Sequence, residues 1–269
     1  MLEDSQQNKI LVFIPCYNCE NQIPRVLEQF RDLAVSKWFN TILVLDNGSR
    51  DNTCSVAQQK ALDLPHLNII VGKNNDNYGL GGSHKSAFSF AIEGDFTHVV
   101  VLHGDDQGAI SDLIPELISM RFNEYDCCLG ARFHPNSSTH GYSRFRILGN
   151  HVFNMIFSLS SFNRVYDLGA GLNIYKTSML KTNFYHQYSD DLRFNCYMLL
   201  GTFSQKLKVH FFPITWREDD QISNVKLFSQ SINTLKIALG FMFFGEKYLA
   251  REHRIKNHKQ YKFTKFYKG

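Results

Sequence analysis

The sequence predicts an α/β fold in which helices cover both faces of a mostly parallel β-sheet. Short apolar runs recur along the first half of the chain, and each is followed by turn residues and then by apolar positions at helical spacing. Strands that are apolar on both faces and alternate with helices are typical of parallel sheets buried on both sides. With 269 residues, 43% of them hydrophobic, the chain is long enough for one large domain with a small appendage.

The elements can be placed in order along the chain. We expect strands at residues 9–15, 41–46, 67–71, 97–103 and 127–131. Helices are expected between them, at residues 22–33, from Asp51 or Asn52 onward, at 82–92 and at 110–122. Later the pattern is looser and predicts helices at 146–159 and 225–244 and strands at 167–175 and 206–214. We therefore expect a main domain at 1–230 and, at 231–269, an extension made of an amphipathic helix and a basic, aromatic tail.

Composition excludes several classes of protein. Charged residues make up 20% of the chain, which is ordinary for a folded domain and argues against wholesale disorder. No run of about 18 apolar residues occurs, and the acidic, polar start MLEDSQQN does not resemble a secretory signal. Cys16 and Cys19 form a CxxC without a second pair, so reduced thiols in a cytoplasmic protein are expected rather than a zinc or redox site.

The end of the chain is basic. Eight Lys or Arg and two Glu occur between Glu246 and Gly269, interleaved with aromatic residues, whereas the whole chain has a net charge of +4. This mixture suits an anionic membrane face, and we expect peripheral contact on the cytosolic side. It would also suit RNA, but no nucleic-acid motif accompanies it, so no nucleic-acid partner is expected. A disordered basic end is an equally simple alternative.

Polar residues gather where three of the predicted strands end. Because the carboxyl ends of parallel strands meet at one edge of a sheet, and open α/β sheets bind ligands there, these residues predict a ligand site rich in acids and turn residues. The three clusters are Pro15-Cys16-Tyr17-Asn18, Asp46-Asn47-Gly48-Ser49 and His103-Gly104-Asp105-Asp106-Gln107.

Several strings together resemble family 2 glycosyltransferases. IPCYNCE, VLDNGSRDNT, NYGLGGSHKSA, LHGDDQ, GAR and DLGAGLNIY occur in the order and spacing of that family, between residues 9 and 230. Within the family the sequence looks most like the branch of polyprenyl-phosphate (dolichyl-phosphate-type) sugar transferases. The resemblance implies a GT-A, Rossmann-like fold and an inverting transfer of one sugar from a UDP- or GDP-sugar donor to a lipid-linked or glycan acceptor.

The resemblance places one group of residues at the nucleotide sugar. Tyr17, Asn18 and Glu20 are expected near the base and ribose, and Asp46 can accept hydrogen bonds there. The glycine-rich loop NYGLGG lets the backbone approach a ligand closely, and the helix after it could face a phosphate with its N-terminus. The simpler alternatives are a turn aromatic for Tyr17 and a capping role for Asp46. The full expected set is Pro15, Tyr17, Asn18, Glu20, Asp46, Gly48, Asn77, Gly79, Gly82 and Asp105.

A metal site is expected after the fourth strand. The family pattern Asp-x-Asp, often followed by Gln, aligns with residues 103–107, so that Asp105 is the central carboxylate and Gln107 the glutamine. Mg²⁺ or Mn²⁺ there would stabilise the negative charge on the departing diphosphate. His103 replaces the first Asp of the pattern, and imidazole, a softer ligand, favours Mn²⁺. We expect Asp105, Gln107 and His103 as ligands and Asp106 as a loop or capping residue; a solvated acidic loop is the plain alternative.

A base and an acceptor site complete the expected machinery. Asp190 and Asp191 lie where family members often carry the base that deprotonates the acceptor, with Asp191 preferred. Two acids at a helix start also simply cap it, and an acceptor that is already a lipid phosphate needs no base. One arginine of the family pattern is replaced by Asn173, which weakens the case for a polyprenyl-phosphate acceptor. The expected contacts to an acceptor phosphate are Arg132, Arg144, Arg146 and Lys226.

Two other classes of function stay open. A sugar nucleotidyltransferase shares a similar sheet but would show a glycine-rich loop with Arg directly after the first strand, where this chain has CYNCENQ. A non-catalytic module that binds nucleotide sugars or docks a partner would tolerate the departures at His103 and Asn173, and it would bind nucleotide without turnover.

Overall fold

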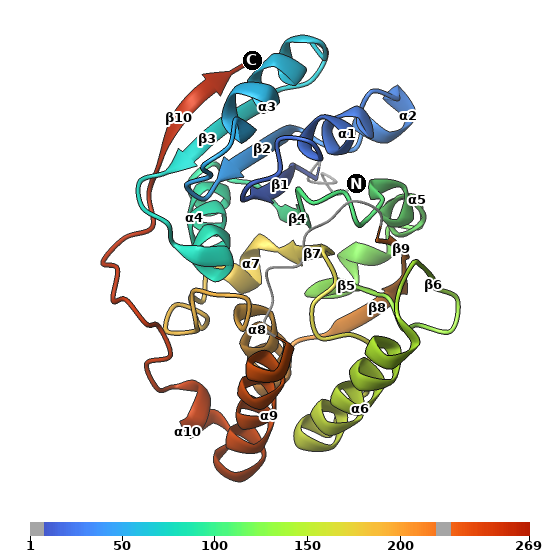
Figure 1. The fold of residues 1–269 in the computed structure, drawn as a ribbon, viewed down its shortest axis with the longest axis vertical. Coiled ribbons are helices and arrows are strands. Elements are labelled where there is room, and N and C mark those ends of the chain that lie inside the picture. The colour runs from blue at the N-terminus through green and yellow to red at the C-terminus, as the bar shows by residue number, and fades with distance from the viewer. Residues whose placement is uncertain (1–7, 219–226) are drawn as a thin grey trace, which may run out of the picture.

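The computed structural model describes residues 8–218 and 227–269 and shows one eight-stranded sheet running through the molecule (Figure 1). The strand order is β10-β3-β2-β1-β4-β7-β5-β8. β3, β2, β1 and β4 are parallel neighbours, β8 is parallel to β5, and β7 and β10 run antiparallel to theirs. The bounds are β1 (Ile10–Cys16), β2 (Thr41–Asp46), β3 (Ile69–Asn74), β4 (His98–Leu102), β5 (Cys127–Ala131), β7 (Leu172–Lys176), β8 (Val209–Pro213) and β10 (Phe263–Lys268), with β6 (Ser138–His140) and β9 (Thr215–Arg217) as a separate parallel pair.

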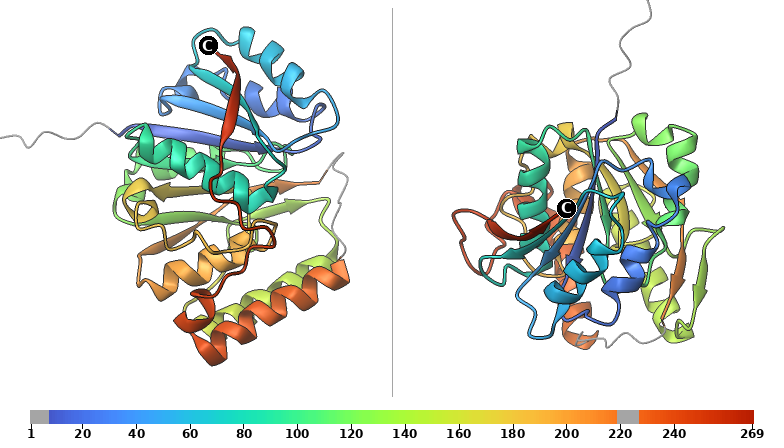
Figure 2. Two further views of the ribbon diagram at one scale, coloured as in Figure 1. Left: turned by 90° about the vertical axis from the view of Figure 1, so that its left-hand side faces the viewer. Right: turned by 90° about the horizontal axis from the view of Figure 1, so that it is seen from above.

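Helices cover both faces of this sheet, which confirms the predicted fold class (Figure 2). The face that includes Val12 and Val44 packs against α1, α3 and α5, and the face that includes Leu11 and Leu43 packs against α4, α7 and α8. Consecutive strand residues thus enter opposite cores, as in a parallel sheet without a solvent face. The bounds are α1 (Ile23–Glu28), α2 (Leu33–Ser36), α3 (Thr53–Leu62), α4 (Gly79–Glu93), η1 (Ile110–Leu113), α5 (Ile114–Ile118), η2 (Arg121–Asn123), α6 (Arg144–Ser161), α7 (Thr177–Leu180), α8 (Phe194–Ser204), α9 (Leu227–Phe244) and α10 (Glu246–Leu249).

Two helices that the sequence predicts as continuous are interrupted in the structure. The helix expected at 110–122 is divided into η1, α5 and η2, because Met120 adopts a left-handed φ of 55° that ends α5. The helix expected at 22–33 ends at Glu28. A separate α2 follows, and the Asp32 side chain caps it by accepting a hydrogen bond from the Ala34 amide (2.8 Å).

The basic tail contributes to the fold. Its last residues form β10, which pairs with the edge strand β3. The ring of Phe263 packs where a side chain on Gly72 would otherwise stand, since a Cβ there would lie 2.5 Å from the ring. The division of the chain at residue 230 stays a prediction, but residues 263–268 belong to the main sheet.

None of the helices in the described residues combines the length and apolarity that crossing a bilayer requires. None of the six cysteines is joined in a disulfide in the structure, and five of them are buried.

Candidate active site

The three polar clusters meet at one edge of the sheet, as predicted. Cys16 and Asp46 are register partners at the ends of β1 and β2. The Asn47 amide donates to the Cys16 carbonyl (2.9 Å), and the Gly104 amide donates to the Pro15 carbonyl (3.1 Å). The carboxyl ends of β1, β2 and β4 are therefore joined directly, which places Asp46 and Asp105 on the same edge.

The loops after β1 and β2 hold each other in place. The Asn18 amide donates to Ser49 Oγ (2.8 Å), and the Ser49 amide donates to Asp46 Oδ1 (3.1 Å). The Glu20 carboxylate accepts from the Asn52 amide (2.9 Å). Of the residues expected at the base and ribose, Asn18 and Glu20 thus serve the loops, whereas Tyr17 is 44% exposed beside them.

A chain of amide side chains joins β2 and β3 to the start of α4. Asn74 Nδ2 donates to Asn47 Oδ1 (2.9 Å) and to Ser83 Oγ (2.8 Å). Asn47 Nδ2 in turn donates to Asn77 Oδ1 (2.9 Å), which also accepts from the Gly79 amide (3.1 Å). The sequence analysis assigned Asn77 and Gly79 to the nucleotide site but gave no role to Asn47 or Asn74. The signal that could have identified these two residues is their position at the ends of two strands, in the strings DNG and KNN.

Asp105 lies at the end of β4 in an environment that disfavours its charge. Burial raises the pKa of its carboxyl to about 6, although the Gln107 amide donates to Oδ1 (3.3 Å). Burial likewise lowers the pKa of His103 to about 4, with a further lowering from the charge of Arg132. His103 is therefore a neutral imidazole at neutral pH, and its Nε2 is buried without a hydrogen-bond partner among the described residues.

Asp106 anchors this loop. Its side chain accepts from Arg25 Nε (2.7 Å) and from Arg217 Nη2 (2.7 Å), and its backbone takes a left-handed φ of 59°. A buried carboxylate held by two guanidinium groups fixes the loop that carries Asp105. This agrees with the structural role expected for Asp106.

The arginines expected at an acceptor phosphate are in different situations. Arg132 is partly buried and forms a bidentate pair with Asp167 (2.8 and 2.7 Å), and its guanidinium lies 4.9 Å from the centre of the Trp216 ring. Arg146 pairs with Glu218 (2.7 Å), and Arg144 is exposed at the start of α6. Lys226 lies outside the described residues. Asp167, which orients Arg132, was missed, although it opens the string DLGAGLN.

The glycine-rich loop approaches a part of the chain itself. A Cβ at Gly79 or Gly81 would collide with the Asp190 or the Ser189 carbonyl oxygen respectively. The Gly81 and Gly82 amides both donate to the Asp190 carbonyl (2.7 and 3.2 Å). The expectation that this helix start faces a phosphate is therefore wrong for these two amides, because a carbonyl of the chain already accepts from them.

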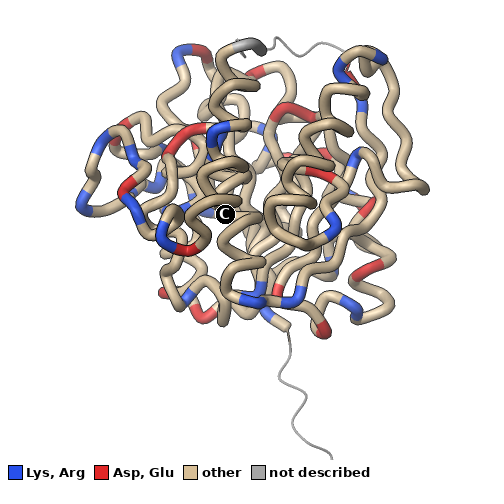
Figure 3. Tube along the Cα trace, turned by 90° about the horizontal axis from the view of Figure 1, so that it is seen from below, with Lys and Arg blue, Asp and Glu red and all other residues tan. Residues whose placement is uncertain are grey.

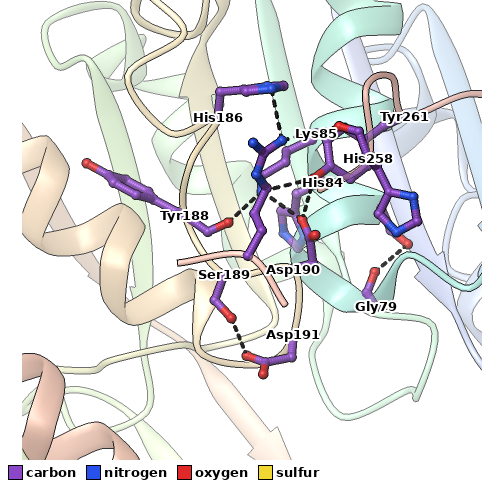
Figure 4. Close-up of polar contacts among 12 residues, drawn as sticks. Gly79, His84, Lys85, His186, Tyr188, Ser189, Asp190, Asp191, His258 and Tyr261 are labelled. Atoms are coloured by element: carbon purple, nitrogen blue, oxygen red, sulfur yellow. Dashed lines mark hydrogen bonds and ion pairs between the residues drawn. The ribbon is translucent and has the colours of Figure 1, made fainter. Parts of the chain in front are cut away.

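The Asp190 side chain belongs to a buried ion pair. Its Oδ1 accepts from Lys85 Nζ (2.7 Å) and from Tyr261 Oη (2.8 Å), and Lys85 also donates to the Tyr188 carbonyl (2.6 Å) (Figure 4). Burial lowers the pKa of Lys85 to about 8, while Asp190 acts to raise it. Tyr261 comes from the C-terminal segment, so the tail helps to hold the loop that carries both acids.

Asp191 points differently. Its carboxylate accepts from Arg193 Nε (2.9 Å) and Ser189 Oγ (2.9 Å), and its side chain is 40% exposed. Burial acts to raise the pKa of Asp191, but the hydrogen bonds from Arg193 and Ser189 outweigh it and leave the pKa below its usual range. Asp191 is thus ionised at neutral pH but is a weak base.

The side chains of His103 and Asp105 are of the types that bind a metal ion whose other ligands come from a bound substrate. No group of three His, Cys, Asp or Glu that could hold a cation occurs in residues 8–218 and 227–269, so a site built from protein groups alone is not found there. Asp105 offers one carboxylate and His103, two residues earlier in the chain, a neutral imidazole, and such ligand types suit Mg²⁺ or Mn²⁺ that takes its other ligands from phosphates and water.

Comparison with known proteins gives the family. The model of Glycosyl transferase family 2 matches residues 11–188, and the chain therefore belongs to this family of glycosyltransferases. An undecaprenyl-phosphate 4-deoxy-4-formamido-L-arabinose transferase from Yersinia enterocolitica is 27% identical over 184 residues, covering 67% of this chain and 53% of that protein. A polyprenol monophosphomannose synthase from Mycolicibacterium smegmatis is 23% identical over 173 residues, covering 64% and 63%. The chain spans about half the length of the arabinose transferases it matches.

Solved structures confirm the GT-A glycosyltransferase fold. Glucosyl-3-phosphoglycerate synthase from Mycobacterium tuberculosis, in complex with Mn²⁺, UDP-glucose and phosphoglyceric acid, superposes with a TM-score of 0.63. The match covers 88% of this chain and 80% of that one at 13% identity. S. aureus TarS 1-349 matches with a TM-score of 0.55 at 16% identity, over 88% and 73% of the two chains. At this level of identity the likeness shows the fold alone.

Proposed function

We propose that this protein transfers one sugar from a UDP- or GDP-sugar to the phosphate of a lipid-linked acceptor. The observation that carries the proposal is the position of the partly buried His103 and Asp105 after β4, on the same sheet edge as Asp46, in a family 2 domain. Relatives named as undecaprenyl-phosphate and polyprenol transferases support the lipid phosphate as the acceptor class.

The donor would lie across the ends of β1, β2 and β4. Asp46 and the exposed Tyr17 would meet the base and ribose, and the backbone at Pro15 and Gly48 would line the same edge. Gly82 would act only indirectly, because its amide is bound to the Asp190 carbonyl. The loop network around Asn18, Glu20, Asn77 and Gly79 would hold this surface in shape before the donor binds, which lowers the entropy lost on binding.

Asp105 and His103 would hold a Mg²⁺ or Mn²⁺ together with the donor's diphosphate, and the Gln107 side chain is a further candidate ligand. When bound, such a cation acts as a Lewis acid that stabilises the diphosphate as it leaves. The raised pKa of Asp105 means that the metal-free site ionises only above about pH 6, so cation affinity is expected to rise through that range.

The acceptor phosphate would be met by cationic side chains beyond β5. Arg132 is held rigidly by Asp167, and Arg144 and Arg146 lie at the start of α6; Lys226 is a further candidate. An acceptor that is already an anion needs no proton removed, so Asp191 and Asp190 would shape the site rather than act as a base, in agreement with the salt bridges both form. Peripheral association with the cytosolic face of a membrane would bring the enzyme to such an acceptor.

The test is nucleotide release from a panel of UDP- and GDP-sugars with Mg²⁺ or Mn²⁺, with and without a polyprenyl phosphate. Release from one donor that depends on the lipid phosphate and is lost in Asp105→Ala is the expected result. Thermal stabilisation by UDP or GDP with no release from any donor would favour a nucleotide-sugar-binding module instead.

A further inference from the structure

The surface formed by α6 and α9 is unlike the rest of the molecule. The two helices pack side by side at the end opposite α3 (Figures 1 and 2). On α6 the exposed side chains recur at intervals of three and four residues, which makes one continuous apolar stripe along the helix. The stripe consists of Phe145, Leu148, Val152, Met155 and Leu159, with exposures between 43% and 82%.

α6 is apolar on two sides. A helix on a globular domain normally turns its apolar stripe toward the core. The buried positions of α6 are Phe157, Asn154 and Ser160, and Asn154 Nδ2 donates to the Tyr166 carbonyl (2.6 Å). The outward stripe is therefore additional to the contacts that hold the helix on the domain, and an exposed apolar stripe of this length indicates that a partner covers it.

α9 continues the same surface. Its exposed apolar side chains have the same helical spacing, while Thr234, Ile237 and Ala238 are buried against the domain. The exposed set is Ile232, Leu235, Leu239, Met242 and Phe243. Seen from below, both helices are free of charge along most of their length (Figure 3).

The charged residues on α6 and α9 themselves have one sign, although the exposed Glu246 follows α9 closely. Residues 144–163 and 227–245 contain no Asp or Glu. Arg144, Arg164 and Lys236 are exposed on or beside the two helices, and Arg251 is exposed over the ring of Phe244 (5.2 Å). None of these four cations forms an ion pair with another described residue. A second copy of the chain would bring like charges together, whereas an anionic lipid surface complements them.

We propose that the α6/α9 face, defined by the two exposed stripes above, docks onto the surface of a bilayer that contains anionic lipid. The inference rests on the proposed function in its choice of partner, because a lipid-linked acceptor resides in a bilayer. It assigns membrane contact to these two helices rather than to the basic tail, whose residues 263–268 are occupied in the sheet. The apolar stripes would enter the interface and the cations would meet lipid phosphates.

The test is flotation of the protein with phosphatidylcholine vesicles that contain about 30% phosphatidylglycerol, without donor or acceptor. The double variant Leu148→Glu/Phe243→Glu is expected to lower the partition coefficient by about tenfold or more, since two apolar side chains no longer enter the interface. The matched control is Leu62→Glu on α3, a residue that is 60% exposed at the opposite end of the molecule, and it should bind like the wild type.

A charge-reversal variant supplies an independent readout. Lys236→Glu should weaken binding to the anionic vesicles and leave any binding to pure phosphatidylcholine unchanged. Far-UV circular dichroism checks that each variant is folded. Equal binding by the wild type and the double variant, or no binding by the wild type, would overturn the proposal. A wild-type dimer that the double variant converts to monomer, without vesicle binding, would assign the face to a second copy. Vesicle binding without release of nucleotide from any donor would refute the proposed function alone.

Discussion

Replacing Asp105 with Asn should stabilise the protein at alkaline pH, although it removes the proposed metal ligand. Burial raises the pKa of Asp105 from 3.8 to about 6. Because the folded-state pKa is the higher one, the favourable contribution of this group is present below its unfolded pKa and is lost as the pH rises through about 6. About two pKa units at about 1.4 kcal/mol each correspond to about 2 to 3 kcal/mol.

The assay is urea unfolding of the metal-free protein at pH about 4 and about 8, with wild type and Asp105→Asn compared at each pH. The stability difference between variant and wild type should shift in favour of Asn by about 2 to 3 kcal/mol on going to the higher pH. Asp191→Asn is the matched control with the opposite sign, since the pKa of Asp191 is lowered and its contribution is lost as the pH falls. The same difference for Asp105→Asn at both pH values would refute the account of its environment.

Two further predictions concern the loop that carries the paired acids. Lys85→Met should destabilise the protein by about 3 to 5 kcal/mol in urea unfolding, because Asp190 is left buried without its cation, and Asp190→Asn in the same chain should recover part of that loss. A single variant as stable as the wild type would contradict this. Asp191→Asn should change the initial rate of transfer to a lipid phosphate by less than about threefold, whereas a loss of about 10²-fold or more would make Asp191 a general base.

Much of the fold could be predicted because it rests on local patterns. The predicted bounds of the strands at 41–46 and 127–131 agree with the structure at both ends, because both strands are apolar runs bounded by turn residues. β10 was missed because FTKFYK reads as a charged tail, with four of its six residues exposed, and its pairing with β3 depends on a contact about 190 residues away in sequence. An edge strand of this kind carries little of the apolar signal that marks a central one.

The candidate site was predicted where it depends on strand ends and missed where it depends on distant partners. Sheet topology alone brought Asp46 and Asp105 to one edge. No sequence pattern could show that Asp167 would orient Arg132, or that the carbonyl of Asp190 would occupy the amides of the glycine-rich loop. Glycines predict that another group comes close to the backbone. Tertiary packing decides whether that group is a ligand or another part of the chain.

The most direct test of the central claim is detection of a glycosylated lipid phosphate. The donor that gives release in the nucleotide panel would be incubated with the protein, Mn²⁺ or Mg²⁺ and vesicles containing a polyprenyl phosphate, and the lipids would be examined by mass spectrometry. The account predicts one sugar added per polyprenyl phosphate by the wild type and none by Asp105→Asn or in the presence of EDTA. Product formation by Asp105→Asn at the wild-type rate, or transfer only to acceptors without phosphate, would contradict it.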